Sequence, residues 1–420
     1  MLNQYLNKKN SFDFNQEEFA LYYLGQMQIK FNGILNNYFN SNKISFNLTA
    51  DKIKSYLFFR YAFLEKKYED KFELLLEKIS NKEIKRLCRD FYQKKELNKL
   101  ADLISLLYQD LDIFIDKINY QKNPTKVLIE ETFDYPKVKN LSRKYTIINL
   151  FKEELKKIEG FIKSCFIHGS FATNDFLEDW SDFDLMIIFR DELFKDGRNI
   201  CQARKVLRKI LPLFYEIDPL THHYFQIVTS SDLNYYPQTI LPLAVYQKGL
   251  KIVGEEKFSV NLRDDSYERM NNLLRFAHHF RKRTKQPPKT IYQLKSDLAH
   301  LFLLPSLLLQ IKGIYLYKKS SFARVKKEFP QIDFSIIDAA TKIRQDWPTS
   351  NLIKYYPNIF WRILPFWFNK SVIYLYAHLL RKARIKRFSQ TEIKELIQRI
   401  HLLFEKALAS VSVKNNGIKF

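Results

Sequence analysis

The stretch SCFIHGSFATNDFLEDWSDFDLMIIF, residues 164–189, is the most informative part of this chain for its fold. Residues 165–167 are an apolar run that stops at Gly169, which predicts a short buried strand. Residues 185–189 form a second apolar run and predict a second strand. Asp182 and Asp184 lead directly into it, and residues two apart in an extended chain point to the same side. We therefore expect both carboxylates at the mouth of the second strand.

This pair of acids predicts a metal site beside a phosphate site. Two carboxylates held close together repel each other unless a cation neutralises them. A hard divalent ion such as Mg²⁺ does so with oxygen ligands and keeps room for substrate phosphates. Gly169 lets the backbone approach a ligand closely, and the Ser170 hydroxyl can donate to a phosphate oxygen. The alternative for the two acids is a solvated turn, which the five apolar residues that follow them disfavour.

Gly169-Ser170 and Asp182-x-Asp184, each beside its own expected strand, resemble the signature of the nucleotidyltransferase superfamily of the DNA polymerase β type. Eleven residues, 171–181, separate the two parts. The resemblance covers residues 140–255 and implies an α+β catalytic core that moves a nucleoside monophosphate from an NTP to an acceptor hydroxyl. It also implies that Gly169 and Ser170 bind the β- and γ-phosphates. Asp182 and Asp184 would then bind two Mg²⁺ ions, with ATP as the expected NTP.

The chain departs from the resembled family at the third expected strand, residues 224–228. That family commonly has a third acidic group there, which completes the metal site or acts as general base. These five residues contain no Asp or Glu, whereas Asp218, His222 and His223 precede them. A neutral imidazole can serve as base near pH 7, and His223 is nearest the expected position. Which of the three replaces the acid stays open, as does a hydrogen-bonding role for the two histidines.

The remaining sequence favours helices on both sides of this core. We expect an N-terminal helical domain at 1–125, the catalytic domain at 140–255 and a basic helical bundle at 260–420. Residues 120–140 read as a linker because two prolines break helices there. Residues 200–211 predict a helix that ends at Pro212. Ser389-Gln-Thr-Glu392 matches a capping box and predicts the start of the last helix.

Charge is unevenly distributed along the chain. The net charge is +23, and residues 281–420 hold 27 Lys or Arg against 8 Asp or Glu, which is +19. Such a segment predicts a polyanionic partner, with RNA the natural candidate. The alternative is a Lys-rich bias on solvated helix faces. One cluster combines cations with aromatic residues that could stack on bases, namely Lys318, Lys319, Arg324, Lys326 and Lys327 with Tyr315, Tyr317 and Phe322.

Other features narrow the class of protein. The three cysteines, Cys88, Cys165 and Cys201, are widely spaced, which suits a reducing compartment and predicts a cytoplasmic protein. Two apolar stretches, residues 298–311 and 360–380, contain prolines or charges, so we expect core helices and no stable membrane insertion. His278 and His279 lie beside a basic run without an acidic neighbour and make poor metal-ligand candidates.

The sequence thus predicts a metal-dependent nucleotidyltransferase. The acceptor is open between RNA, a small molecule and a protein side chain, and the basic C-terminal part favours RNA. The rival interpretation is an interaction protein that binds nucleotide on the same fold with weakened catalysis. The missing acid in residues 224–228 favours that rival, and the intact Asp182-x-Asp184 pair opposes it.

Overall fold

The computed structural model describes most of the chain. The described residues are 16–41, 44–62, 72–118, 124–128, 142–173, 176–177, 180–218, 220–221, 224–239, 241–263, 266–347, 375, 377–385 and 388–412.

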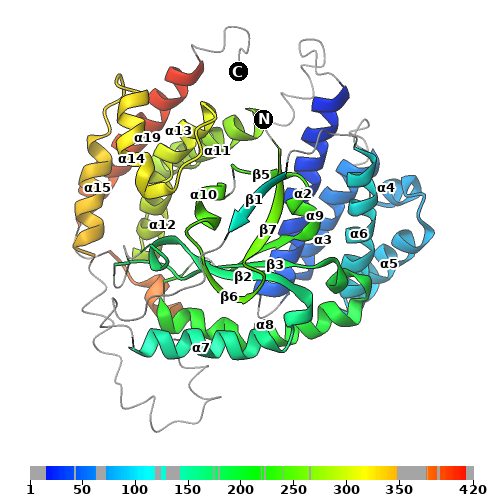
Figure 1. Ribbon diagram of the computed structural model, residues 1–420. Coiled ribbons are helices and arrows are strands. Elements are labelled where there is room, and N and C mark those ends of the chain that lie inside the picture. Colours follow the sequence, from blue (N-terminus) through cyan, green and yellow to red (C-terminus); the bar gives the residue numbers. More distant parts are fainter. Residues whose placement is uncertain are drawn as a thin grey trace.

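A four-stranded mixed sheet lies at the centre (Figure 1), with the strand order β4-β3-β2-β6. The strands are β2 (Ile162–His168), β3 (Asp184–Phe189), β4 (Phe225–Thr229) and β6 (Leu250–Gly254). Strand β3 pairs antiparallel with β2 and parallel with β4, and β6 closes the other edge antiparallel to β2. Strands β2, β3 and β4 were expected from the sequence, and their existence is confirmed.

Each face of this sheet is covered by a different layer. Cys165, Leu185, Ile187 and Phe225 belong to the larger core, which includes helices α7 (Ser142–Lys156) and α8 (Gly197–Ile217). Side chains of the other face, including Phe166, pack in a smaller core against the second sheet. Figure 1 shows α7 and α8 below the sheet and the second sheet above it. The alternation of side chains along each strand therefore sends His168 and Asp184 to the second-sheet side.

The second sheet has three strands in the order β1-β7-β5. They are β1 (Pro124–Leu128), β7 (Lys257–Arg263) and β5 (Tyr236–Pro237). Strand β1 lies within residues 120–140, where a linker was predicted, so that prediction was incomplete. Pro124 stands at the first residue of the strand, a position that tolerates a missing backbone N–H.

The N-terminal helices form one continuous core with the central sheet. They are α2 (Gln16–Asn40), α3 (Phe46–Leu57), the π-helical turn η1 (Phe58–Ala62), α4 (Phe72–Lys78), α5 (Lys82–Lys94) and α6 (Leu97–Lys117). Buried residues of α2 and α6 belong to the same apolar cluster as those of β2, β3 and α8. The helical character of this region is as expected, while the division of the chain into three domains stays a prediction.

Helix α8 continues past Pro212, where the sequence predicted its end. A proline inside a helix loses one backbone hydrogen bond and costs roughly 3 kcal/mol. Leu213, Phe214 and Ile217 beyond it are all buried in the main core. Burying a large apolar side chain stabilises by about 1.5–3 kcal/mol, so three of them offset the proline. Tertiary packing here overrides the local signal.

A second core lies in the C-terminal helices. They are α11 (Ser266–Lys285), α12 (Ile291–Leu301), α13 (Leu304–Ile311), α14 (Lys318–Glu328), α15 (Ser335–Gln345) and α19 (Gln390–Ser412). The predicted capping box is confirmed, since Glu392 N donates to Ser389 Oγ and Ser389 N donates to Glu392 Oε2. Most of residues 351–387 lie outside the described part.

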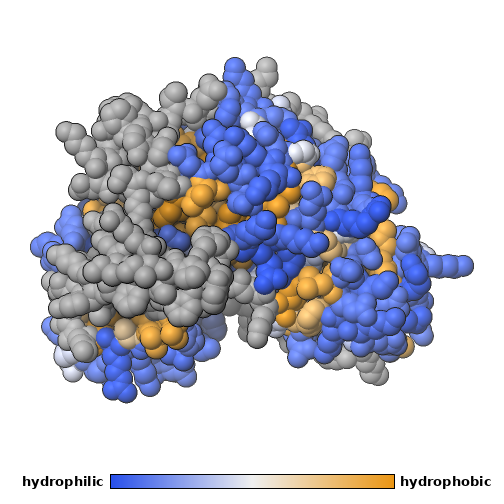
Figure 2. All heavy atoms as spheres, turned by 90° about the horizontal axis from the view of Figure 1, so that it is seen from below, coloured by the Kyte–Doolittle hydropathy of each residue, from blue (hydrophilic) through white to orange (hydrophobic). Residues whose placement is uncertain are grey.

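Among the described residues, one segment is long and apolar enough to cross a membrane, Ile291–Ile311. Within the fold it is divided between α12 and α13, and 72% of its apolar window is buried inside the protein. The described surface seen in Figure 2 is mainly hydrophilic, with hydrophobic side chains in separate patches. The segment is thus used as core, which agrees with the expectation of no stable insertion.

Candidate active site

Asp182 and Asp184 stand at the start of β3, as the alternation of side chains predicted. Phe183 between them is fully buried and packs on Phe151, Phe171 and Phe214. The two acids are only partly buried. The buried ring fixes the backbone, and the backbone then presents both carboxylates on the opposite side.

Gly169 lies against the carboxylate of Asp184. Its φ is +73°, in the left-handed region that favours glycine, and a Cβ there would lie 2.4 Å from Asp184 Oδ2. The sequence assigned Gly169 to close approach of a phosphate. In the structure, the close approach of the Asp184 carboxylate already requires a glycine at this position. Ser170 follows in the 3-10 turn η5 (Gly169–Phe171) and is partly exposed beside it.

Lys295 of α12 adds a cation to this site. Its Nζ lies 2.8 Å from Asp182 Oδ1 and 2.7 Å from Asp218 Oδ2. Lys295 and Asp218 are almost completely buried, with side-chain exposures of 2% and 3%. Asp218, one of the three residues considered for the missing acid, is therefore linked to Asp182 through Lys295 of α12.

The cluster of Lys295, Asp182 and Asp218 has an unbalanced charge. Burial raises the pKa of Asp218 well above its usual range, with the Lys295 ammonium opposing and Asp182 adding to that shift. Burial alone would lower the pKa of Lys295, but the two carboxylates outweigh it and raise that pKa. Lys295 is therefore charged at neutral pH. One ammonium faces two carboxylates, so the cluster favours taking up a further positive charge, either a proton or a metal cation.

His168 and Gln226 occupy the same face of the sheet as Asp184. His168 pairs with Asp184 across β2 and β3, and its Nε2 lies 3.1 Å from Gln226 Oε1. Burial lowers the pKa of His168, although Asp184 and the bond to Gln226 oppose the shift. The imidazole is therefore neutral near pH 7. Gln226 lies on β4, the strand where the resembled family commonly has a third acid.

Part of the predicted site lies outside the described residues. His222 and His223 belong to that part, so the choice of His223 as the catalytic base stays a prediction. The structure adds Lys295, which sequence reasoning missed. One signal was present, because Lys295 falls on the apolar face of α12 between Leu294 and Leu298, where a lysine needs a buried partner.

Tyr317 also reaches this region from the C-terminal helices. Its hydroxyl lies 2.9 Å from Thr173 Oγ1, and Thr173 donates in turn to the carbonyl of Gly169. Tyr317 packs on the smaller core, and Phe322 packs on the C-terminal core. These two aromatic residues of the predicted nucleic-acid cluster therefore have roles within the fold.

Residues 148–235 match the family model of the nucleotidyltransferase domain. This part of the chain is a nucleotidyltransferase domain. The match is consistent with the polymerase-β type of superfamily and includes Gly169, Ser170, Asp182, Asp184 and Asp218. No curated protein and no solved structure compared with the chain matches it. Lys295 lies outside the matched nucleotidyltransferase domain.

The nucleotidyltransferase domain presents a donor set that suits a divalent cation. Asp182 and Asp184 offer carboxylate oxygens, the ligands that Mg²⁺ prefers. Asp182 already holds a cationic group, the Lys295 ammonium, at hydrogen-bond distance. The residues present therefore fit the metal that the family implies.

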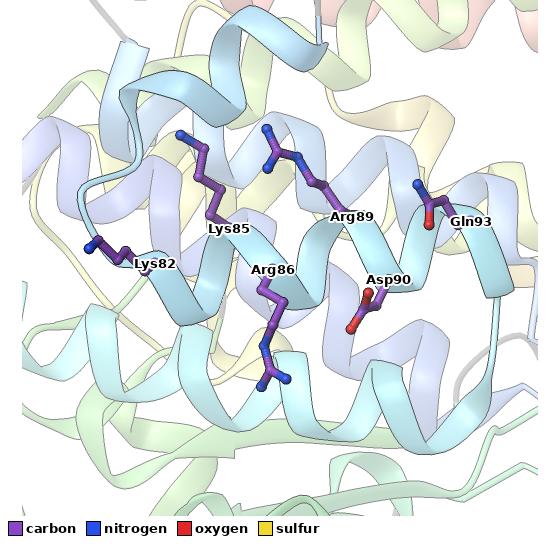
Figure 3. Close-up of a pocket in the computed structure, with 6 residues that line it drawn as sticks. All are labelled: Lys82, Lys85, Arg86, Arg89, Asp90 and Gln93. Atoms are coloured by element: carbon purple, nitrogen blue, oxygen red, sulfur yellow. The ribbon is translucent and has the colours of Figure 1, made fainter.

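A separate basic surface lies on α5, far from the two acids in sequence. Four cations line a hollow of about 380 Å³ there together with Asp90 and Gln93 (Figure 3), namely Lys82, Lys85, Arg86 and Arg89. Arg86 lies 3.8 Å from Glu83, and Arg89 lies 3.9 Å from Glu73, so both pairings are loose. This surface lies outside residues 281–420, the segment where the net charge of the sequence is concentrated.

Proposed function

We propose that this protein transfers a nucleoside monophosphate from an NTP to an acceptor hydroxyl. The observation that carries the proposal is the placement of Asp182 and Asp184 beside Gly169 and Ser170 within a matched nucleotidyltransferase domain. In this proposal Asp182 and Asp184 hold Mg²⁺, with ATP as the expected donor. Divalent cations bound there would neutralise the phosphates and lower the pKa of the acceptor hydroxyl.

The other residues of the site would bind phosphate, hold the carboxylates or deprotonate the acceptor. Ser170 donates its hydroxyl to a phosphate oxygen, and the backbone at Gly169 keeps the adjoining carboxylate in place. Lys295 offsets one of the two negative charges of Asp182 and Asp218 before substrate binds, and its ammonium can donate to a phosphate oxygen once Asp182 has another cation. The Gln226 amide cannot act as a general base. Deprotonation of the acceptor is therefore assigned to His223, with His222 and Asp218 as the other candidates.

RNA is the favoured acceptor because of the +19 charge of residues 281–420. Small molecules and protein side chains are the alternatives. The test is incubation of the purified protein with Mg²⁺ and each labelled NTP in turn, against total RNA, a metabolite extract and a protein extract. Label transferred to one fraction identifies the acceptor class. Absence of label in every fraction, with every NTP, contradicts the proposal.

A second candidate function is nucleotide binding with weakened turnover. The observation in its favour is Gln226 on the strand where an acid was expected, together with the Lys295 ammonium on Asp182. Calorimetry with each NTP separates the two candidates. Mg²⁺-dependent binding without label transfer supports the second, and binding with transfer supports the first.

A further inference from the structure

Three side chains with metal-binding groups meet in the C-terminal helices, outside the Asp182–Asp184 site. They are His279 on α11 and Asp297 and His300 on α12, and one ligand atom of each lies within 4.8 Å of the others. His279 Nε2 is 2.8 Å from Asp297 Oδ1. Asp297 and His300 are three residues apart on a helix, so they share a face. From the sequence we expected His279 to be a poor metal ligand, because no acidic residue lies near it in the chain. The fold places Asp297 beside it.

We propose that His279, Asp297 and His300 bind a transition-metal ion of the zinc type. Two imidazoles and one carboxylate are a donor set that suits Zn²⁺, with the fourth position left for water. Mg²⁺ prefers oxygen ligands and is not expected here. The Asp297 carboxylate is completely buried, whereas the His279 side chain is 31% exposed and gives the ion a path from solvent.

The geometry requires only local adjustment. Zinc bonds of about 2.0–2.1 Å in a tetrahedron place the donor atoms roughly 3.3 Å apart. The His279–Asp297 separation of 2.8 Å is already close to that value. Binding would replace the hydrogen bond between these two side chains by one metal bond to each. The His300 ring then needs to turn toward them.

Arg283 is the feature that opposes metal binding and makes the proposal testable. Its Nε lies 3.1 Å from Asp297 Oδ1 and 3.0 Å from Oδ2. Without metal, this guanidinium neutralises the buried carboxylate. With metal on Oδ1, Arg283 stays on Oδ2 as an outer partner of the ligand. Its positive charge weakens the attraction of the site for a cation, so its removal should strengthen metal binding.

A metal bound here would also constrain α12, the helix whose Lys295 contacts Asp182 in the candidate active site. Helix α12 carries Asp297 and His300 and also Lys295, which contacts Asp182. An ion shared between α11 and α12 would fix α12 relative to α11. A ligand that binds only the folded state also raises its stability. We therefore expect Zn²⁺ to raise the Tm of the protein at concentrations above the dissociation constant.

The experiment uses the full chain, stripped of metal and without a histidine tag. Titration with Co²⁺, followed by visible absorption, reports coordination directly, and Zn²⁺ should displace Co²⁺ with one equivalent per chain. His279→Ala and His300→Ala should each lose at least about tenfold in affinity, the scale found even for outer partners of metal ligands. The control is His278→Ala, which changes an exposed neighbour of the same type. Where an Ala variant fails to fold, the Gln variant at the same position replaces it.

The outcomes separate this site from the Asp182–Asp184 site. We expect the Asp182→Asn/Asp184→Asn double variant to keep its zinc, excess Mg²⁺ to leave zinc bound, and Arg283→Gln to bind zinc more tightly. Absence of cobalt absorption in the wild type overturns the proposal. So does unchanged affinity in both histidine variants, or loss of zinc from the Asp182→Asn/Asp184→Asn variant.

Discussion

The ammonium of Lys295 lies 2.8 Å from the Oδ1 atom of Asp182, although 113 residues separate them in the sequence. This contact joins the C-terminal helices to the first acid of the Asp-x-Asp motif. Asp218 accepts from the same ammonium, so one buried cation contacts both acids. A divalent ion at Asp182 and the Lys295 ammonium therefore compete for one carboxylate.

We expect Lys295→Met to destabilise the fold by about 3–5 kcal/mol in the absence of divalent ions. Removing one partner of a buried ion pair leaves an uncompensated charge, and effects of that size are typical. Urea unfolding at pH 7 measures the change, and Lys289→Met, at an exposed position, is the control. Mg²⁺ should stabilise Lys295→Met more than the wild type. Equal stability of the two proteins would mean that the contact contributes nothing.

Gly169→Ala tests the contact with Asp184. The new Cβ would meet Asp184 Oδ2 at 2.4 Å, and a φ of +73° costs a non-glycine residue roughly 1–2 kcal/mol. We expect this modest destabilisation together with severe loss of nucleotide transfer, because the carboxylate must move. Gly160→Ala is the matched control, since nothing lies within 4 Å of a Cβ at that position. Full transfer by Gly169→Ala would show that Asp184 tolerates displacement.

The pH dependence of stability tests the buried Asp232. Burial raises its pKa to about 6, against the hydrogen bonds that Thr229 donates to it. Because the folded pKa is raised, the folded state binds the proton more tightly. The associated stability is present below pH 4 and is lost as pH rises to about 6. At roughly 1.4 kcal/mol per pKa unit, the loss is about 3 kcal/mol.

The measurement for Asp232 compares the wild type with Asp232→Asn by urea unfolding between pH 4 and 7. Asn keeps an acceptor oxygen but does not titrate in this range, so other titrating groups such as His168 cancel in the difference. We expect the stability of the wild type relative to the variant to fall as pH rises. A difference that stays constant with pH would place the pKa of Asp232 near that of an ordinary aspartate.

The proposed RNA acceptor makes a prediction about salt. Each phosphate contact with a single strand contributes roughly −0.7 to the slope of log affinity against log salt concentration. Replacing Lys318, Lys319, Arg324, Lys326 and Lys327 by Gln should flatten the slope measured by filter binding. Arg324 already pairs with Glu328 and Lys326 with Asp338, so these two should matter least.

The matched control for the salt experiment is Gln at Lys82, Lys85, Arg86 and Arg89, the cations of the α5 hollow. If that control flattens the slope and the C-terminal variant does not, nucleic acid binds the N-terminal helices. No measurable binding by the wild type at low salt removes RNA from consideration and leaves small molecules and proteins as acceptors.

The local elements of the site could be predicted from the sequence, but its long-range contacts could not. The apolar runs and the alternation at Phe183 set the strands and the direction of the acids. The predicted end of α8 at Pro212 was wrong, because the burial of side chains beyond Pro212 outweighs the cost of the proline. Lys295 and the Asp297–His279 pair depend on how distant helices pack. The position of Lys295 on the apolar face of α12 indicates that it needs a buried partner, but nothing in the sequence says that the partners are Asp182 and Asp218.

In the proposed function, Asp182 and Asp184 carry nucleotide transfer. The most direct test of this role is the rate at which label moves from an NTP to acceptor with Mg²⁺, for the wild type, Asp182→Asn, Asp184→Asn and the control Asp116→Asn, which changes an exposed aspartate of α6. Unfolding curves would establish that each variant is folded. We expect Asp182→Asn and Asp184→Asn to lose transfer by on the order of a hundredfold or more, the scale for groups that stabilise developing charge, with Asp116→Asn unaffected. Transfer at the wild-type rate by folded Asp182→Asn and Asp184→Asn proteins would contradict this role of the two acids.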